Sequence, residues 1–359
     1  MQLEQVVNDK AIVVRYTSDP TASEPFIGET LFPSKRSGSL TLEWAKGYNG
    51  LPAALRPSAL DTQPALRDRL GAESILTEMP FFREQMTVRE KERQQILEIN
   101  NTASPTFKAI VAKIYDDAAQ LIGGARVQRE RMRMQLLYSG AIAITAPDDT
   151  GRKANFDIQY DDAKGTWRKS NASFKFDWSN PNTSTPIEDI NKILDAADEL
   201  GLPVPTRAIA SRKIISLLSK SVSIRKYMNP VGYTNMAPLS DSDVIAYIAK
   251  ETGVTIIKND KNYKDVDGSI KKYWPEDKIS FFTAGALGNT WFGTTPEEAD
   301  LANGGQPGVN VSIVDTGVAV AVWKDARNVP VQMITNVSQL CVPSFEAMNN
   351  VFVATIKIA

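Results

Sequence analysis

The chain contains no histidine among its 359 residues and a single cysteine, Cys341. The commonest general base and the commonest metal ligand are therefore missing. This excludes Ser-His-Asp and Cys-His catalysis within one chain, and also zinc sites with imidazole ligands. One cysteine cannot form an intrachain disulfide, so we expect the chain to fold in a reducing compartment. Because Cys341 lies between Leu340 and Val342, we predict a buried structural thiol rather than a reactive one.

Long apolar runs and an excess of one charge are also absent from the sequence. No stretch approaches the ~20 apolar residues of a membrane span, and the first ten residues lack the apolar core of a secretion signal, so we expect synthesis and folding in the cytosol. The formal net charge of -1 argues against a dedicated nucleic-acid binder, which usually carries a basic excess. The chain is 42% hydrophobic and 23% charged, which is typical of a globular protein with room for two or three domains.

The first part of the chain predicts an extended arm. Asp19-Pro20, Glu24-Pro25 and Phe32-Pro33 bias the backbone toward extended conformations. The same stretch carries four apolar residues that need a partner surface: Phe26, Ile27, Leu31 and Phe32. A frayed terminus would explain the prolines, whereas an arm that becomes ordered against a neighbouring subunit also explains the apolar residues. We favour the second interpretation.

A long helix over residues 104–139 is the clearest element. Ser104 is a good N-cap and Pro105 suits the first helical position. Apolar residues follow at spacings of three and four, and the pattern ends near Gly140. Gly123-Gly124 predicts a weakened or bent middle, and the lack of sustained heptads argues against the alternative of a coiled coil.

The remaining patterns indicate an α+β layout without regular βαβ alternation. Strand patterns at 40–44 and 75–88 enclose a stretch with proline and glycine, which predicts a protruding hairpin. Residues 186–200 and 209–228 are predicted helices, and the chain is rich in strand patterns from Val309 onward.

One motif suggests catalysis. Val314-Asp315-Thr316-Gly317 matches the signature of aspartic proteases, in which two such aspartates share a proton. The motif occurs once, and too little chain follows it for the rest of a protease domain. We therefore interpret it as a turn between two valine-rich strands, in which Asp315 accepts backbone N–H groups and Gly317 supplies backbone freedom.

Two further groups of charged residues have competing interpretations. The stretch from Asp260 to Asp267 suggests a calcium loop, but Lys264 and Lys271 occupy positions that need oxygen ligands, so a solvated hairpin is favoured. Four arginines crowd the second half of the long helix and could form an internal basic face toward DNA: Arg126, Arg129, Arg131 and Arg133. Helical periodicity spreads them around the axis, which favours ion pairs between subunits or a solvated face.

The order of these elements resembles the lambda-type capsid protein E family of tailed phages. Three segments carry the resemblance: Pro25-Phe26-Ile27-Gly28-Glu29-Thr30-Leu31-Phe32-Pro33; Phe81-Phe82-Arg83-Glu84-Gln85-Met86, which leads into the long helix; and Cys341-Val342-Pro343-Ser344-Phe345-Glu346, which Val351-Phe352-Val353 follows. Together they span nearly the whole chain, and their order is more specific than any one of them.

The resemblance implies an α+β, HK97-like capsid fold with five parts. These are an N-terminal arm at 1–36, an E-loop hairpin at 37–88, a P-domain at 89–185 with the spine helix at 104–139, an A-domain at 186–320, and C-terminal strands at 321–359 that return to the P-domain. Family-like sequence begins close to Met1, so we expect a separate scaffolding protein rather than a fused one.

The implied function is that of a major capsid protein, a structural protein of the virion and not an enzyme. Copies would assemble in the host cytoplasm, as hexamers and pentamers, into the icosahedral head shell around the phage genome. No cofactor is expected. Besides itself, its expected partners are a scaffolding protein, the portal protein, a decoration protein and packaged double-stranded DNA, which it would contact non-specifically. The alternative is an encapsulin-like nanocompartment shell around an enzyme cargo. The predicted contacts between subunits are Phe26, Ile27, Leu31, Phe32, Arg56, Arg67, Asp68 and Arg69.

Overall fold

The computed structural model describes residues 9–18, 25–38, 41–46, 73–88, 94, 105–147, 153–228, 239–325 and 331–358. The chain divides into two compact units. Unit 1 comprises Met1–Glu43, Leu76–Met132 and Asn289–Ser344; unit 2 comprises Trp44–Ile75, Arg133–Gly288 and Phe345–Ala359. Both units combine helices with sheets, as the predicted α+β class requires.

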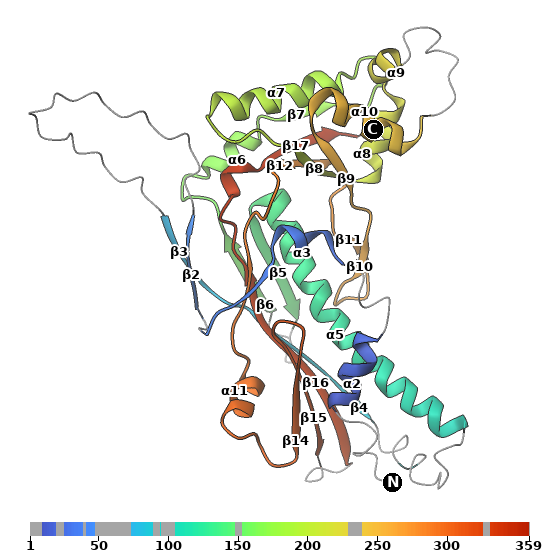
Figure 1. Cartoon of the computed structure of the whole chain (residues 1–359), viewed down its shortest axis with the longest axis vertical. Helices are drawn as coiled ribbons and strands as arrows, with labels where there is room; N and C mark the ends of the chain where they lie inside the picture. The colour runs from blue at the N-terminus through green and yellow to red at the C-terminus, as the bar shows by residue number, and fades with distance from the viewer. Residues whose placement is uncertain are drawn as a thin grey trace, which may run out of the picture. The chain divides into compact units, whose positions relative to one another are not determined.

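The described helices and strands follow in chain order (Figure 1). The helices are α2 (Asp9–Thr17), α3 (Ile27–Leu31), α5 (Pro105–Ser139), α6 (Thr166–Asn171), α7 (Pro186–Glu199), α8 (Arg212–Lys220), α9 (Val222–Met228), α10 (Asp241–Thr252), α11 (Pro296–Ala302) and the 3₁₀ helix η2 (Met348–Asn350). The strands are β1 (Ser34–Arg36), β2 (Thr41–Lys46), β3 (Glu73–Glu78), β4 (Phe81–Val88), β5 (Ala141–Pro147), β6 (Lys153–Gln159), β7 (Lys175–Asp177), β8 (Arg207–Ala210), β9 (Thr255–Lys258), β10 (Asn262–Lys264), β11 (Ile270–Lys272), β12 (Lys278–Phe282), β13 (Thr290–Phe292), β14 (Val309–Val314), β15 (Val318–Asp325), β16 (Gln332–Pro343) and β17 (Phe352–Lys357).

Unit 1 is built on a six-stranded sheet with the long strand β16 at its centre. Strand β15 pairs along one side of β16, and β4 and β13 pair with successive parts of its other side. Strand β14 continues the sheet beyond β15, and β1 joins β13 in parallel. The valine-rich segments therefore form the strands that the sequence predicts, and the Asp-Thr-Gly motif lies in the turn between β14 and β15.

Helix α5 covers one face of this sheet. Its apolar residues, among them Ile114, Ala118 and Ile122, pack with Val320 and Val337 in one buried cluster. The helix begins at Pro105 and ends at Ser139, as residues 104–139 predict. Residues up to Met132 belong to unit 1 and those from Arg133 to unit 2. Gly123 and Gly124 lie within a continuous helix.

Gly140 ends α5 because its backbone adopts a conformation that other residues rarely take. Its φ is 66°, and its N–H donates to the carbonyl of Leu136 at 2.9 Å. A Cβ atom here would approach the Trp167 ring to 2.7 Å. Glycine at 140 is therefore required both by the turn and by close packing in unit 2.

Unit 2 contains a five-stranded sheet in the order β7-β17-β12-β8-β9. Alternate residues of its strands, such as Ile279, Phe281 and Ala354, share one core with α7, α8, α9 and α10. On β12, the intervening Ser280 donates to the carbonyl of Leu137 near the end of α5, at 2.9 Å. One face of the sheet thus packs on four helices, while Ser280 on the other face contacts the C-terminal end of α5.

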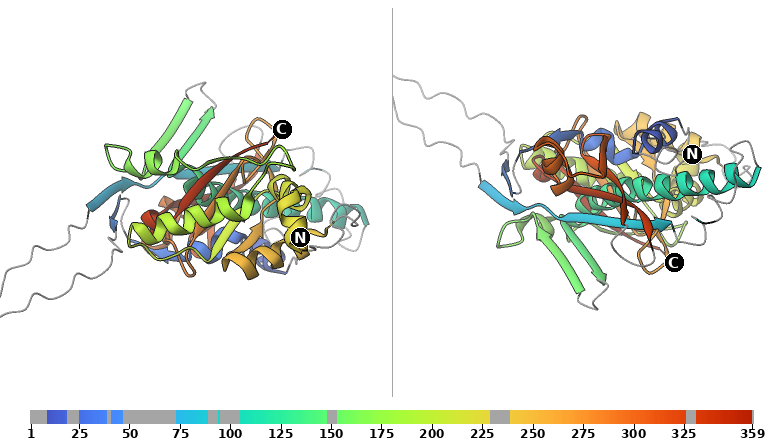
Figure 2. Two further views of the ribbon diagram at one scale, coloured as in Figure 1. Left: turned by 90° about the horizontal axis from the view of Figure 1, so that it is seen from above. Right: turned by 90° about the horizontal axis from the view of Figure 1, so that it is seen from below.

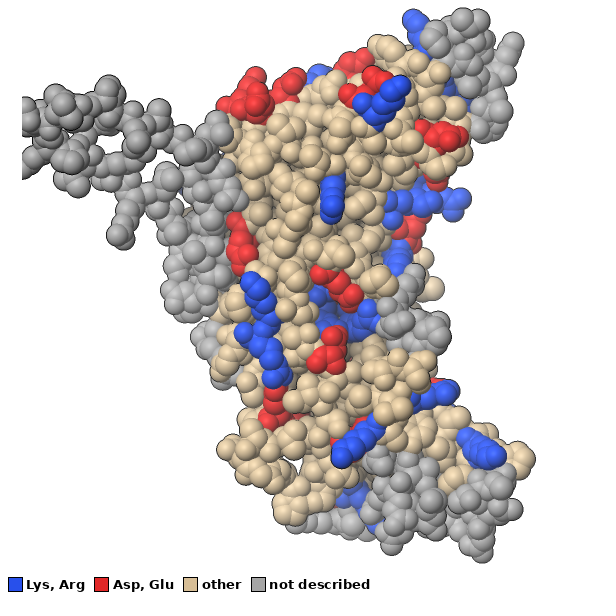
Figure 3. Space-filling model, viewed as in Figure 1, with Lys and Arg blue, Asp and Glu red and all other residues tan. Residues whose placement is uncertain are grey.

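The helices of unit 2 differ in charge. Helix α7 carries five acidic residues and one lysine, whereas the stretch from Arg212 to Met228, which forms α8 and α9, carries five basic residues and no acidic one. Acidic side chains gather over α7 at the upper left of Figure 3. The small net charge of the whole chain therefore hides a local separation of opposite charges.

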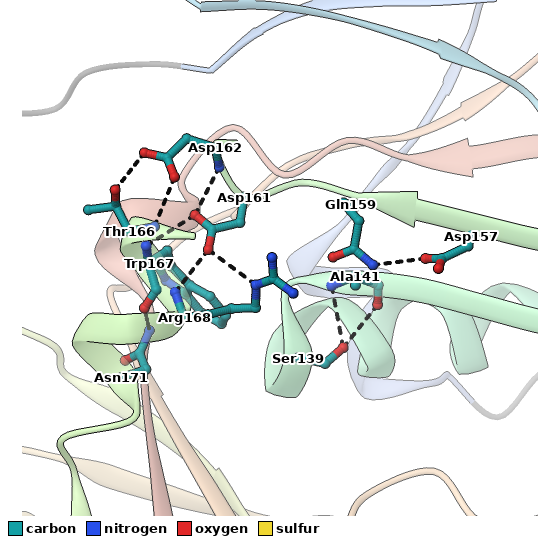
Figure 4. A network of polar contacts seen from close by, with 10 residues as sticks. All are labelled: Ser139, Ala141, Asp157, Gln159, Asp161, Asp162, Thr166, Trp167, Arg168 and Asn171. Carbon is teal, nitrogen blue, oxygen red and sulfur yellow. Dashed lines mark hydrogen bonds and ion pairs between the residues drawn. The ribbon is translucent and has the colours of Figure 1, made fainter. Parts of the chain in front are cut away.

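A network of polar contacts fixes the short helix α6 in unit 2 (Figure 4). The Asp161 carboxylate accepts the backbone N–H of Trp167 and of Arg168, each at 3.0 Å. The Asp162 carboxylate accepts the N–H and the hydroxyl of Thr166 at 2.8 and 2.6 Å. The two carboxylates thus satisfy the exposed N–H groups at the start of α6. The Trp167 indole then donates to the carbonyl of Val351 at 2.9 Å, close to β17.

Three two-stranded ribbons complete the described structure: β2 with β3, β5 with β6, and β10 with β11. Figure 2 shows β5 and β6 as a ribbon that stands apart from the other strands of unit 2. The ribbon of β10 and β11 confirms the hairpin that we preferred to a calcium loop.

Strand pairing separates some residues that the sequence places together. The expected A-domain at 186–320 includes β14, which pairs with β15 in the sheet of unit 1. The expected C-terminal strands at 321–359 include β17, which pairs with β12 and β7 in the sheet of unit 2. A boundary at 320 would cut through β15, which spans Val318–Asp325. The domain boundaries remain predictions.

None of the helices in the described part of the chain combines the length and the apolar character that crossing a bilayer requires.

Candidate functional site

The N-terminal segment, residues 9–18 and 25–38, folds onto unit 1. Ile12 and Tyr16 of α2 are 1% and 8% exposed and belong to the same core as α5 and the valine strands. The Asp9 carboxylate also accepts a hydrogen bond from the Ser312 hydroxyl of β14. The expectation of an extended arm is therefore wrong for these residues, because α2 and α3 are helices with partners inside their own unit.

Leu31 and Phe32 are buried within unit 1, at 1% and 0% exposure. The Phe32 carbonyl accepts the Thr290 hydroxyl at 2.9 Å, and the Pro33 carbonyl accepts the Thr290 N–H at the same distance. Strand β1 then continues in parallel beside β13. We had predicted that these two side chains contact a neighbouring subunit. That prediction is wrong, because both side chains are already buried inside their own subunit.

Phe26 and Ile27 are half-buried, so the structure leaves their predicted contact with a neighbour untested. Arg56, Arg67, Asp68 and Arg69 lie outside the described residues.

A cluster of three α5 side chains, Arg126, Arg129 and Glu130, holds the N-terminal segment and the Asp-Thr-Gly turn. Arg126 pairs with Glu29 at 3.0 Å, and its guanidinium lies 5.2 Å from the centre of the Phe26 ring. The Glu130 carboxylate accepts the Gly28 N–H at 3.0 Å. These contacts fasten α3 to the spine helix by charge and by hydrogen bonding.

Arg129 makes the deepest ion pair of the cluster. Its side chain is 2% exposed and donates to the Asp315 carboxylate at 2.8 Å, where Asp315 itself is 44% exposed. The guanidinium also lies 5.3 Å from the centre of the Phe292 ring. Burial alone would raise the pKa of Asp315, but the charge and the hydrogen bond of Arg129 hold that pKa below its ordinary value. Asp315 is therefore an ionised partner of a buried cation.

The turn around Asp315 explains its residues in structural terms. Asp315 has a φ of 56° and is the one described residue other than glycine with a positive φ; aspartate is among the few residues that tolerate this conformation. Gly317 does not supply the backbone freedom that we expected. A Cβ at 317 would approach the Phe292 side chain to 2.7 Å, so glycine is needed there for close packing. The carbonyl between them, that of Thr316, accepts the Arg36 guanidinium at 2.8 Å.

The four arginines of α5 do not form one exposed basic face. Arg129 and Arg133 are buried, at 2% and 1% exposure, and Arg126 is engaged with Glu29. Arg131 is half-buried. Arg129 and Arg133 therefore do not offer their charges to DNA in this structure, because packing within the subunit encloses them.

A second polar cluster in unit 1 fixes β4, the last strand of the predicted E-loop hairpin at 37–88. Glu297 of α11 is 7% exposed and pairs with Arg83 of β4. Its carboxylate also accepts Asn336 Nδ2 at 2.9 Å and the Ser338 hydroxyl at 2.7 Å. Burial alone would raise the pKa of Glu297, but these hydrogen bonds and the charge of Arg83 hold it below the ordinary value.

Sequence reasoning missed the acidic members of both clusters, Glu29, Glu130 and Glu297. The signal for Glu130 was available, since it is the lone carboxylate among the arginines of α5 and lies four residues from Arg126. Glu29 and Glu297 depend on contacts between distant parts of the chain, for which one sequence offers no local signal.

The family model for phage major capsid protein E matches residues 15–345. The chain belongs to this family. A comparison with curated proteins finds no match. The family match covers α2 from Arg15 through β16, and so includes both polar clusters.

Solved structures agree with the family in fold. The prophage capsid protein of E. coli CFT073 is 12% identical, with a TM-score of 0.51 over 80% of each chain. A phage-related protein of Bordetella bronchiseptica RB50 is 14% identical, with a TM-score of 0.52 over 97% of each chain. This capsid protein therefore has the HK97-like α+β fold that the resemblance implied.

Membership of the family answers two questions that the sequence left open. Phage major capsid protein E is a family of structural capsid proteins rather than enzymes, so Asp-Thr-Gly here is part of a shell subunit. The nanocompartment alternative is not favoured, because the matching family is that of phage capsids. The protein is a component of the virion that assembles with itself.

Proposed function

We propose that this capsid protein assembles as hexamers and pentamers, and that the hairpin of β2 and β3, within the expected E-loop at 37–88, overlies an adjacent subunit. The observation that carries the hairpin proposal is the pairing of β2 with β3. These strands flank residues 47–72 and form a sheet of their own. A two-stranded ribbon is marginally stable alone in water, so a neighbouring subunit would stabilise it by packing or strand addition.

The anchoring of β4 supports the same proposal. Eight consecutive residues of β4 pair with β16, and Arg83 adds the ion pair with buried Glu297. The strand after the hairpin is thus firmly held in unit 1. Force on the hairpin from a neighbouring copy would be transmitted to the central sheet, which suits a shell that contains pressurised DNA.

Further partners follow from the family and not from contacts in this chain. Assembly would need a scaffolding protein, and the finished shell would meet a portal protein, the packaged double-stranded DNA and a decoration protein. Assembly in the host cytoplasm belongs to the same proposal.

Co-expression with and without the scaffolding protein, followed by electron microscopy, tests the assembly. We expect closed shells built from rings of five and six copies; a subunit that stays monomeric in both conditions would contradict the proposal. Arg67→Glu with Arg69→Glu tests the hairpin, and should lower particle yield while the unassembled subunit melts like the wild type. Lys164→Glu with Lys169→Glu, two exposed lysines at α6, is the matched control. Equal yields from both double variants would refute the placement of the hairpin.

A further inference from the structure

The C-terminal end of α7 carries an acidic face, defined here as Asp195, Asp198, Glu199, Leu200 and Val204. The three acids are exposed, and none of them takes part in an ion pair with another described residue. Leu200 and Val204 are 59% and 45% exposed. The face thus joins carboxylates to apolar side chains that water surrounds in the isolated subunit.

These acids are at the unfavourable end of their helix. The C-terminus of a helix carries a partial negative charge and favours cations, yet the last turn of α7 holds no basic residue. Asp195, Asp198 and Glu199 therefore repel both the helix end and one another. A local cost of this kind points to a partner that supplies positive charge.

The end of α8 and the length of α9 carry a complementary basic face, defined as Lys220, Arg225, Lys226 and Tyr227. Lys220 and Lys226 are exposed, and neither forms an ion pair within the described residues. Tyr227 is 57% exposed, and tyrosine is enriched at protein interfaces. This face also joins charge to apolar surface, with the opposite sign.

The two faces lie at opposite ends of α7. The Val222 N–H of α9 donates to the Pro181 carbonyl at 2.9 Å, and the Ser184 and Ser221 hydroxyls are 2.8 Å apart. Helix α9 therefore begins beside the N-terminal end of α7. Because α7 has 14 residues, its C-terminal end lies about 21 Å away. The faces are too far apart to neutralise each other within one subunit.

We propose that the acidic face of one copy docks on the basic face of the next copy. A surface that fits a different surface of the same chain makes a head-to-tail contact, and such contacts form a ring when the rotation from copy to copy closes. The proposal rests on the assembly into hexamers and pentamers, and it names one of the surfaces by which copies in a ring meet. The opposite charges match, each face brings exposed apolar area, and the carboxylates at the end of α7 gain the cations that they lack.

Charge reversal on each face, alone and together, is the test. Asp195→Lys with Asp198→Lys makes both faces basic, and Lys220→Glu with Lys226→Glu makes both faces acidic. We expect each double variant to lower particle yield by about tenfold or more, because like charges then meet in every contact. The quadruple variant inverts both faces, and should restore yield to near the wild-type level.

Melting of the unassembled subunits separates assembly from folding. The Asp195→Lys, Asp198→Lys subunit should melt at or above the wild-type temperature, since lysines suit the end of α7. Lys164→Glu with Lys169→Glu, two exposed residues outside both faces, again serves as the control and should assemble normally. Normal yields from both double variants, or a quadruple variant no better than they are, would overturn the proposed contact. Wild-type protein that forms no rings would instead overturn the proposed assembly, on which the contact depends.

Discussion

Phe32→Ala should destabilise unit 1 severely, because the side chain is fully buried inside its own subunit. Phe32 is 0% exposed, and its carbonyl accepts the Thr290 hydroxyl. Replacing a buried phenylalanine by alanine costs about 3–5 kcal/mol, through lost burial and the cavity that remains. The free energy of unfolding of a protein is typically about 5–15 kcal/mol, so Phe32→Ala would remove a large part of it.

Urea unfolding of the unassembled subunit, followed by circular dichroism, measures this effect on the free energy of unfolding. Phe26→Ala is the matched control. Phe26 is half-buried and stacks with Arg126, so Phe26→Ala should lower the free energy of unfolding by only about 1 kcal/mol. The reasoning would be refuted if Phe32→Ala lowered the free energy of unfolding by less than Phe26→Ala does.

Three other perturbations test the clusters and the spine helix. Gly124→Ala should stabilise the subunit by about 0.5–1 kcal/mol in thermal melts, because the added methyl meets no atom within 4 Å and glycine disfavours helices. Asp315→Asn should assemble, and its free energy of unfolding should exceed that of Asp315→Ala by at least about 1 kcal/mol, since asparagine tolerates the positive φ of this residue and alanine does not. Equal melting temperatures for the two variants would contradict a structural role for the turn. The free energy of unfolding should be greatest above pH 4 and should fall as the pH drops below the ordinary carboxyl pKa of about 4. The reason is that folding lowers the pKa values of Asp315 and Glu297, so protonation of these carboxylates favours the unfolded state. In acid unfolding curves, Glu297→Gln should lose less free energy of unfolding between neutral and acidic pH than the wild type.

The sequence predicted correctly those elements that are determined by residues close to one another in the chain. Helix α5 follows from Pro105 at its start, the three- and four-residue apolar spacing, and Gly140 at its end. Strands β14 and β15 follow from alternating valines, whose turn is marked by Asp-Thr-Gly. Cys341 is buried, as its apolar neighbours predicted. In each case neighbours in sequence determine the outcome.

The N-terminal segment shows where such signals fail. Prolines at 20, 25 and 33 predicted extended backbone, but α2 forms before Pro20 and α3 forms between Pro25 and Pro33. Helix α2 packs against residues far along the chain, such as Val314 and Val337, and α3 is followed by the pairing of Ser34 with Thr290. Propensity is a weak guide when tertiary contacts supply most of the stability.

The segment from 209 to 228 shows a second kind of error. We predicted one helix, whereas Arg207–Ala210 forms β8 and the helices α8 and α9 follow. A short apolar run gives no periodicity by which to tell a buried strand from a helix. Ser211 was the missed signal, since its hydroxyl caps α8 by accepting the Ile214 N–H at 3.3 Å, which marks where the helix begins.

The position of the N-terminal segment changes how contacts between subunits should be sought. Leu31 and Phe32 are already buried, so they cannot contribute apolar area to a neighbour without leaving their own core. Removing these side chains from their own core would cost several kcal/mol per copy. This cost exceeds the free energy that most exposed ion pairs contribute. Contacts between copies should therefore concentrate on surfaces that the subunit leaves unsatisfied. Within the described residues these surfaces include the ribbon of β2 and β3, and the oppositely charged ends of the helical layer in unit 2. The first would extend one subunit over another, and the second would join copies head to tail, so the two proposals address different contacts and can fail separately.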